Sequence, residues 1–366
     1  MPKFINGLDL SHAFYRDVIR PILEQHDTEL EYAAGLIGRG SEVLGYDDKM
    51  STDHDWGPSV TLFFKYEDAH LIPMIQELLR HELPHHFRGY STNFMPAPES
   101  PNNQVMTITT RGAVNHNVKP ITVRDYFEQM LGWIPVEEID VVDWLTFPSH
   151  KLRALTSGAV FHDGIGELTH IRAQLGWYPD DVWLYLMMAQ WSRIGEEEHL
   201  MGRAGYRGDD LGATIIANRL VNDVMRLCFL FAKEFAPYPK WFGRAFTDLP
   251  MASTLTPMLQ ALQQADNWET RQSAYTGIIE FMLDQHNQLG ITKPLDVRAK
   301  QFHTRPFYVA DGGAVANALR QNITDSEVLR LFSLPTPIGS LDQISDETSL
   351  KEFASWRQRL KQFYQT

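Results

Sequence analysis

The chain has 366 residues, of which 43% are hydrophobic and 22% charged, which is typical of a globular protein with one large domain or two smaller ones. Its formal net charge of -13 argues against a general nucleic-acid-binding surface, because such a surface needs basic residues to neutralise phosphates. The single cysteine, Cys228, excludes an intrachain disulfide. We expect a cytoplasmic protein, since we find no signal peptide and no apolar run of about 20 residues that would span a membrane.

The first half of the chain alternates helical and strand-like patterns. Apolar spacing predicts a helix over residues 9–26, and a buried strand over 33–37 that enters a tight turn at Gly38-Arg39-Gly40. Residues 53–64 predict a second strand, bent at Gly57-Pro58. The remaining predicted elements, in chain order, are a helix over 68–82, β-like stretches over 87–94 and 104–111, a helix near 122–131 and a β-hairpin over 158–176.

The second half is predicted to be helical. A helix begins at Asp180 or Asp181, and apolar faces recur over 211–235, 254–265, 268–289 and a polar tail, 341–366. We therefore predict an α+β fold. A mixed sheet with flanking helices occupies residues 1–178, an α-helical bundle 179–310, and a C-terminal helical tail 311–366.

The strongest chemical signal lies between Gly40-Ser41 and Asp53-His54-Asp55. On a strand, Asp53 and Asp55 would point to one face and His54 to the other. Two carboxylates so close repel each other unless a cation lies between them, and Mg²⁺ suits this position because it takes one or two protein carboxylates together with substrate phosphates. The Gly-Ser turn offers backbone N–H groups and a hydroxyl for a triphosphate. An Asp-x-Asp alone is usually a solvated strand end, but the joint pattern favours a functional site.

The stretch AAGLIGRGSEVLGYDDKMSTDHDWG resembles the signature of the DNA-polymerase-β-like nucleotidyltransferase superfamily. Within it, the chain is similar to a bacterial group catalogued only as a domain of unknown function, which shares the blocks GSEVLGYDD, DHDWGP, GAVFHDGIGELT, DVWLY and APYPKWFG. This resemblance extends to roughly residue 310. More distantly, the chain resembles aminoglycoside and lincosamide nucleotidyltransferases, in which a helical bundle also follows the catalytic domain. The implied fold is therefore of the nucleotidyltransferase type.

The resemblance also implies residue roles. Gly40 and Ser41 would hold the β- and γ-phosphates, and Asp53 and Asp55 would bind one or two Mg²⁺ ions. A third carboxylate usually lies on a neighbouring strand as a metal ligand or general base, yet the stretches FRGYSTNF and VMTITTR contain no acid. The candidates for the third carboxylate are Glu167, which we prefer, Asp163, which also suits a turn, and Asp143.

Other polar residues have two readings each. Members of the superfamily often supply a lysine and a tyrosine from the helical domain to the triphosphate, a role that would fall to Lys240 and Tyr238 here. Arg219, Asp223 and Arg226 have helical spacing, so they form mutual ion pairs or the arginines contact phosphate. The run Glu196–Glu198 is either a solvated helix face or a wall of the acceptor pocket.

These observations favour a Mg²⁺-dependent enzyme that transfers a nucleoside monophosphate, AMP from ATP first of all, to a hydroxyl group of a small molecule such as an antibiotic or metabolite. A protein-AMPylating enzyme and a catalytically inactive nucleotide-binding regulatory protein are the alternatives. ATP or another NTP is the expected partner, and nucleic acid and membrane are not expected. The net negative charge favours a neutral or cationic acceptor.

Overall fold

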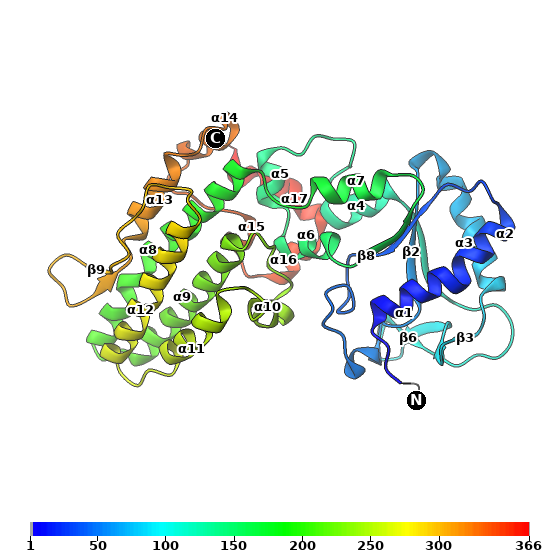
Figure 1. The fold of residues 1–366 in the computed structure, drawn as a ribbon, viewed down its shortest axis with the longest axis horizontal. Coiled ribbons are helices and arrows are strands. Elements are labelled where there is room, and N and C mark those ends of the chain that lie inside the picture. The colour runs from blue at the N-terminus through cyan, green and yellow to red at the C-terminus, as the bar shows by residue number, and fades with distance from the viewer. Residues whose placement is uncertain (1–2, 366) are drawn as a thin grey trace. The chain divides into compact units, whose positions relative to one another are not determined.

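The computed structural model describes residues 3–365 and divides into two compact units. The first unit comprises Met1–Glu138 and Lys151–Gly176, and the second comprises Ile139–His150 and Trp177–Thr366. The chain therefore passes through a short piece of the second unit before it completes the first (Figure 1).

A four-stranded mixed sheet forms the centre of the first unit. Its strands are β1 (Ala33–Leu36), β2 (Ser59–Phe64), β7 (Asn117–Thr122) and β8 (Ala159–Asp163), in the order β7-β2-β1-β8. β1 is antiparallel to β2 and to β8, whereas β2 and β7 are parallel. Every residue of β1 and β2 is buried, which explains why these two strands are continuous runs of apolar and small residues rather than alternating patterns.

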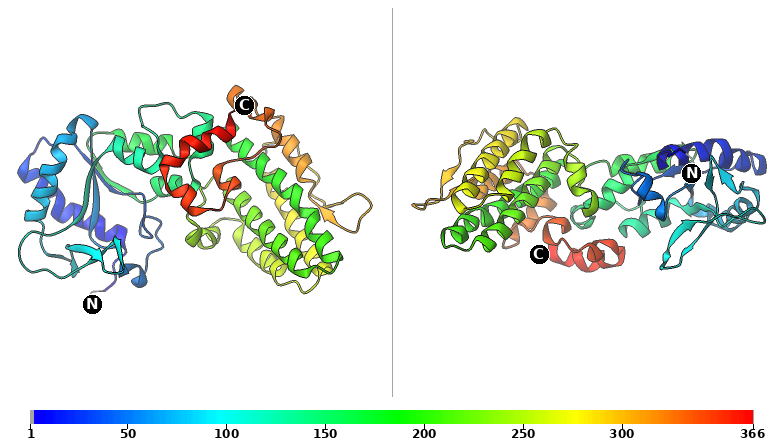
Figure 2. Two further views of the ribbon diagram at one scale, coloured as in Figure 1. Left: turned by 180° about the vertical axis from the view of Figure 1, so that it is seen from behind. Right: turned by 90° about the horizontal axis from the view of Figure 1, so that it is seen from below.

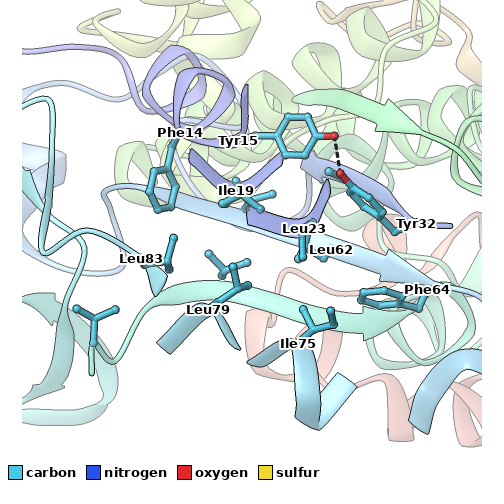
Figure 3. Packing of buried hydrophobic residues seen from close by; sticks show 14 residues of the cluster. Phe14, Tyr15, Ile19, Leu23, Tyr32, Leu62, Phe64, Ile75, Leu79 and Leu83 are labelled. Carbon is cyan, nitrogen blue, oxygen red and sulfur yellow. Dashed lines mark hydrogen bonds between the residues drawn. The ribbon is translucent and has the colours of Figure 1, made fainter. Parts of the chain in front are cut away.

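Helices cover both faces of this sheet. On one face Leu62 and Phe64 pack in a cluster with Phe14, Ile75 and other apolar side chains (Figure 3). On the other face the Phe63 ring makes an edge contact with Tyr126. The helical elements of the first unit are α1 (Gly7–Phe14), a π-helical segment (Tyr15–Ile19), α2 (Arg20–His26), a 3-10 segment (Tyr66–Leu71), α3 (Ile72–Glu82), α4 (Val123–Leu131), most of α6 (Ser149–Thr156) and α7 (Glu167–Gln174).

Two short hairpins lie between α3 and β7. The first pairs β3 (His86–Phe87) with β4 (Tyr90–Ser91), and the second pairs β5 (Phe94–Ala97) with β6 (Ser100–Met106). The second hairpin matters for the site because β6 contacts the segment that precedes β2, as described below.

The second unit is a helical bundle built around two long helices, α8 (Asp180–Tyr206) and α9 (Asp210–Phe231), with α11 (Ala252–Gln263) and α12 (Trp268–Gln288) packed against them (Figure 2). The apolar spacing seen in the sequence accounts for the packing, since Leu220, Val224 and Leu227 of α9 are all buried. The other elements are α5 (Val141–Thr146), α10 (Pro239–Phe246), β9 (Lys300–Gln301), β10 (Tyr308–Val309), α13 (Gly312–Arg320), α14 (Ser326–Arg330), α15 (Leu341–Ile344), α16 (Thr348–Glu352) and α17 (Arg357–Leu360).

The α+β fold class is confirmed, with a mixed sheet, flanking helices and a C-terminal helical region. The predicted hairpin over 158–176 is wrong, because only β8 is a strand and α7 follows it. The reason for this difference is local. The Asp163 carboxylate accepts hydrogen bonds from the backbone N–H groups of Gly166 and Thr169, and these bonds start a helix instead of a second strand. Between residues 3 and 365, none of the helices combines the length and apolar character that a membrane span requires.

Glu198 is a buried acid in the bundle. The acidic run was read as a solvated face or a pocket wall, yet Glu198 is only 2% exposed. Its carboxylate accepts hydrogen bonds from the Tyr275 hydroxyl at 3.1 Å and the Ala310 backbone N–H at 2.6 Å. These hydrogen bonds therefore hold the segment that precedes α13 against α8. Burial raises the pKa of the Glu198 carboxyl to about 7, although these hydrogen bonds oppose the shift.

We predict that this carboxyl makes the protein less stable as pH rises from about 4.5 to about 7. In that window the folded state holds a proton that the unfolded state has lost, so the free energy of unfolding falls with increasing pH. Thermal melts of the Glu198→Gln variant should show a flatter pH dependence than the wild type over that range. An unchanged pH profile would contradict the assignment, and Glu269→Gln, which changes an exposed acid in the first turn of α12, serves as the control.

Candidate functional site

A glycine-rich turn follows β1. Gly38 and Gly40 have φ values of +94° and +127°, a region that side chains other than glycine rarely adopt. A Cβ atom at Gly40 would also overlap the carboxylate of Glu42. The chain then closes a further turn in which the Tyr46 backbone N–H donates to the Ser41 carbonyl at 2.9 Å. The Gly40-Ser41 backbone is thus fixed in a tight conformation at the end of a buried strand.

Asp53 and Asp55 do not lie on a strand, so the predicted strand over 53–64 is wrong in its first part. Lys49–Asp53 is a 3-10 helix that Asp48 caps, and β2 begins only at Ser59. The alternation that would place both aspartates on one face therefore does not apply. The Asp53 carboxylate is largely exposed and lies 3.0 Å from Nδ1 of His54.

Asp55 is held in an unusual backbone conformation. Its φ is +52°, a left-handed value that Asp and Asn tolerate better than other non-glycine residues. Its backbone N–H donates to the Gln104 carbonyl at 2.6 Å, and its Oδ1 accepts from the Gln104 N–H at 2.8 Å. These two bonds fix the carboxylate against β6. In the described part of the chain, no hydrogen bond is made to its other oxygen, Oδ2.

The sheet topology brings the glycine turn and Asp55 to one edge. β1 and β2 are antiparallel, with Gly35 opposite Thr61, so the residues after Leu36 and the residues before Ser59 lie at the same end of the sheet. Glu42 links the two segments, because its carboxylate lies against Gly40 and is influenced by the charge of Asp55. The structure therefore assembles Gly40, Ser41 and Asp55 in one place, with Asp53 close to Asp55 in the chain.

Glu42 is the buried acid of this edge and was not predicted. It is 6% exposed. Burial raises the pKa of its carboxyl group to about 7, with the charges of Asp47 and Asp55 adding to the shift and Lys119 on β7 opposing it. Its position directly after Gly40-Ser41 is the sequence signal that could have identified it.

Asp47 ties the turn to the rest of the unit. Its Oδ2 accepts from the Gly7 backbone N–H at 2.7 Å and from the Trp56 indole N–H at 2.9 Å. Gly7 is the first residue of α1, where the helix dipole favours a negative charge. Trp56 is 2% exposed and stacks on Phe4. The other oxygen of Asp47 is buried and accepts no hydrogen bond from the described residues.

The preferred third carboxylate, Glu167, is not at this edge. β8 is antiparallel to β1, with Asp163 opposite Ala33 and Ala159 opposite Leu36. Asp163 and Glu167 therefore lie at the other end of the sheet from Gly40-Ser41. Glu167 instead interacts with Glu67 and Lys65, which follow β2 at that far end. Asp163 has the turn role described above, and neither acid completes the predicted site.

Asp143 belongs to the second unit, where it has a structural role. Its carboxylate forms an ion pair with Arg357 and lies 2.5 Å from Nζ of Lys361. It also accepts from the Asp140 backbone N–H as part of the capping box of α5. All these contacts are within the second unit, and they account for the burial of the Asp143 carboxylate.

Tyr238 and Lys240 also belong to the second unit. Tyr238 is the residue before α10 and its ring makes an edge contact with His150. The Lys240 ammonium lies over the Trp241 ring, 4.8 Å from its centroid. Their contact with a triphosphate stays a prediction.

Positive charge accompanies the glycine turn within the first unit. Arg39, between the two glycines, is exposed and interacts electrostatically with Lys151. Lys151 is buried and donates to the Met130 carbonyl at 2.8 Å. Burial lowers the pKa of Lys151 to about 8, and the charge of Arg39 adds to the shift. The glycine turn therefore carries one guanidinium group, whose charge acts on the buried ammonium group of α6.

Comparison with known proteins gives one family match and one similar solved structure. A family described as "Domain of unknown function (DUF4037)" matches residues 144–242, less than half of the chain and outside the glycine turn. No curated protein matches. A solved structure described as a nucleotidyltransferase-like protein from Exiguobacterium sibiricum 255-15 is similar, with 10% identity, a TM-score of 0.31, and coverage of 84% of this chain and 88% of that one.

Proposed function

We propose that the protein is a Mg²⁺-dependent nucleotidyltransferase that transfers a nucleoside monophosphate, with ATP as the donor, to a hydroxyl group of a small molecule. One observation supports this proposal above the others. The tight glycine turn at Gly40-Ser41 and the fixed carboxylate of Asp55 share one edge of the sheet, with two further acids, Glu42 and Asp47, beside them. Backbone N–H groups next to carboxylates suit a metal-bound triphosphate.

The donor set fits a magnesium ion that arrives with the nucleotide. In residues 3–365, no group of three or more His, Cys, Asp or Glu side chains is arranged to hold a metal ion. Mg²⁺ does not need such a group, since it commonly takes one or two protein carboxylates, substrate phosphates and water. Asp53 and Asp55 would hold the ion, which would neutralise developing charge on the phosphates. The buried Oδ1 of Asp47 accepts no hydrogen bond from the described residues, so a further acceptor oxygen is available at this edge.

The chain's own residues have distinct parts in this proposal. Gly40 and Ser41 would position the β- and γ-phosphates, and Gln104 orients Asp55 through two hydrogen bonds. Arg39 and Lys151 would favour the negative charge of the nucleotide. Glu42, which lies at this edge whereas Glu167 lies at the other end of the sheet, would take the part of the third carboxylate. Catalysis would consist mainly of positioning and charge stabilisation during in-line attack on the α-phosphate.

Two measurements test the proposal. Calorimetry should detect ATP binding that depends on Mg²⁺, and ATP labelled at the α-phosphate should yield labelled product and pyrophosphate when small hydroxyl-bearing acceptors, neutral and cationic ones first, are supplied. Binding without pyrophosphate release from any acceptor would favour an inactive nucleotide-binding protein. Labelling of protein instead of small molecules would favour AMPylation, and the absence of Mg²⁺-dependent ATP binding would overturn the proposal.

A further inference from the structure

A polar cavity of about 240 Å³ lies within the second unit. Two long helices and the segment 342–346 form its walls. The side chains from the helices are Arg193 on α8 and Asn218, Arg219, Asn222, Asp223 and Arg226 on α9. Among the five residues of α9, each has another three or four positions away, so they share one face of that helix.

The three charged residues of α9 do not pair with one another, so that reading of the sequence is wrong. Arg219 pairs with Glu197 of α8 at 2.7 Å. Asp223 pairs with Arg193 at 2.9 Å. Arg226 pairs with Asp346 of the segment after α15 at 2.7 Å. Three guanidinium groups therefore lie around one cavity, each with a different carboxylate partner.

The buried acids of the cavity wall are already satisfied. Asp223 accepts from the Gln190 side-chain amide at 3.0 Å and from Nε of Arg193 at 3.1 Å. Asp342 accepts from the Ser149 backbone N–H at 2.7 Å and from Nζ of Lys351 at 3.2 Å. Both oxygens of each acid are therefore engaged by protein donors.

Only some of the side-chain N–H donors in the cavity wall form hydrogen bonds with described residues. Nε of Arg226 donates to Oδ1 of Asn222 at 2.7 Å. Because arginine can only donate, this contact fixes the amide orientation and leaves the Asn222 NH₂ group for other acceptors. Arg219 uses its Nε, and among the described residues no acceptor is placed on its two Nη atoms. The wall therefore holds N–H donors on Arg219 and Asn222 that no described residue accepts.

The charge balance depends on one exposed residue. Arg193, Arg219, Arg226 and Lys351 are matched by four acids, namely Asp223, Glu197, Asp346 and Asp342. The Asp346 side chain is 75% exposed, whereas that of Arg226 is only 17% exposed. An ion pair with so exposed a partner contributes little stability and opens readily. When Asp346 turns to solvent, the cavity gains one positive charge and one more guanidinium edge.

We propose that this cavity binds a small phosphate-bearing ligand, with the phosphate replacing the Asp346 carboxylate on Arg226. Guanidinium groups from two helices present forked donors that match the several oxygens of a phosphate, and the size of the cavity limits the ligand to a small molecule. The site uses none of the residues of the proposed nucleotide site, so it does not depend on the proposed function.

Calorimetry on the full chain at low ionic strength, without ATP or Mg²⁺, tests this proposal. Inorganic phosphate and glycerol 3-phosphate are the two probes, and tighter binding of the second would indicate a phosphate ester rather than the free ion. Arg219→Gln and Arg226→Gln should each weaken binding by about tenfold or more. Asp346→Asn should tighten it several-fold, and Arg219→Lys should have an intermediate effect because the fork is lost and the charge kept.

Arg330→Gln is the matched control, because Arg330 is an exposed arginine paired with Glu327 on α14, outside the cavity. Circular dichroism checks that each variant is folded. The proposal is overturned if neither probe binds at millimolar concentration, or if the cavity variants bind as the wild type does. It is also overturned if Ser41→Ala removes phosphate binding while the cavity variants keep it, since the phosphate would then occupy the proposed nucleotide site.

Discussion

Replacement of Asp55 by asparagine is expected to reduce nucleotidyl transfer by roughly a thousandfold or more. Losses of this size are typical when a group that stabilises developing charge is removed. The change deletes the negative charge that would hold the metal. It should preserve the local structure, because asparagine also tolerates the left-handed conformation. Its side-chain oxygen can still accept from the Gln104 backbone N–H. The measurement is the rate of labelled product formation at saturating ATP and Mg²⁺.

Asp48→Asn is the control for this variant. Asp48 lies in the same loop and caps the 3-10 helix, and asparagine caps as well as aspartate. This variant should keep full activity. Equal activity in Asp55→Asn and Asp48→Asn, with both proteins folded by circular dichroism, would show that Asp55 is not part of a metal site.

Replacement of Asp143 by alanine is expected to lower the free energy of unfolding by about 3–5 kcal/mol, the usual cost of removing one partner from a buried ion pair. Arg357 is 5% exposed and would keep its charge without this carboxylate. Urea denaturation followed by circular dichroism measures the loss. Transfer activity, measured where the variant is still folded, should be unchanged, because Asp143 has a structural role in the second unit.

Two further variants make this test specific. Asp140→Ala removes the more exposed acid of the same capping box and should cost only about 1 kcal/mol. The double variant Asp143→Leu with Arg357→Met should recover much of the stability, because a pair of apolar side chains replaces the buried ion pair while Lys361 keeps Asp140 as a partner. If Asp143→Ala left stability unchanged but abolished transfer, Asp143 would have to be reassigned to the reaction.

The strands and helices could be predicted where one local pattern controls them. The buried run 33–37 and the amphipathic spacing of α9 are formed as expected, since apolar periodicity alone determines which face is buried. The strand that was expected to begin at Asp53 fails for an equally local reason. Asp48 caps a 3-10 helix and Asp55 adopts a left-handed conformation. Both conformations depend on side-chain hydrogen bonds, which the spacing of apolar residues does not reveal.

The candidate site was predicted only where its residues are close in the chain. Gly40-Ser41 and Asp55 are found at one sheet edge, but the preferred third acid was not, because its position depends on strand order and direction. Glu167 follows β8, whose antiparallel pairing with β1 carries it to the far end of the sheet. The acid that does lie beside the turn, Glu42, is two residues from Gly40 and needed no such topology.

The route of the chain between its two units has a consequence for folding during synthesis. Residues 139–150 belong to the second unit, although β8, the last strand of the first unit's sheet, is made after them. Some contacts of the second unit can form only when the C-terminal residues have been made. Thr146 and Arg357, for example, are 211 positions apart and are joined by a hydrogen bond. Contacts of such long sequence separation slow folding. A protease cut or a gene truncation near residue 178 would therefore not release an independent first unit. It would leave that fragment with an α5 segment whose buried carboxylate, Asp143, has lost its cationic partners.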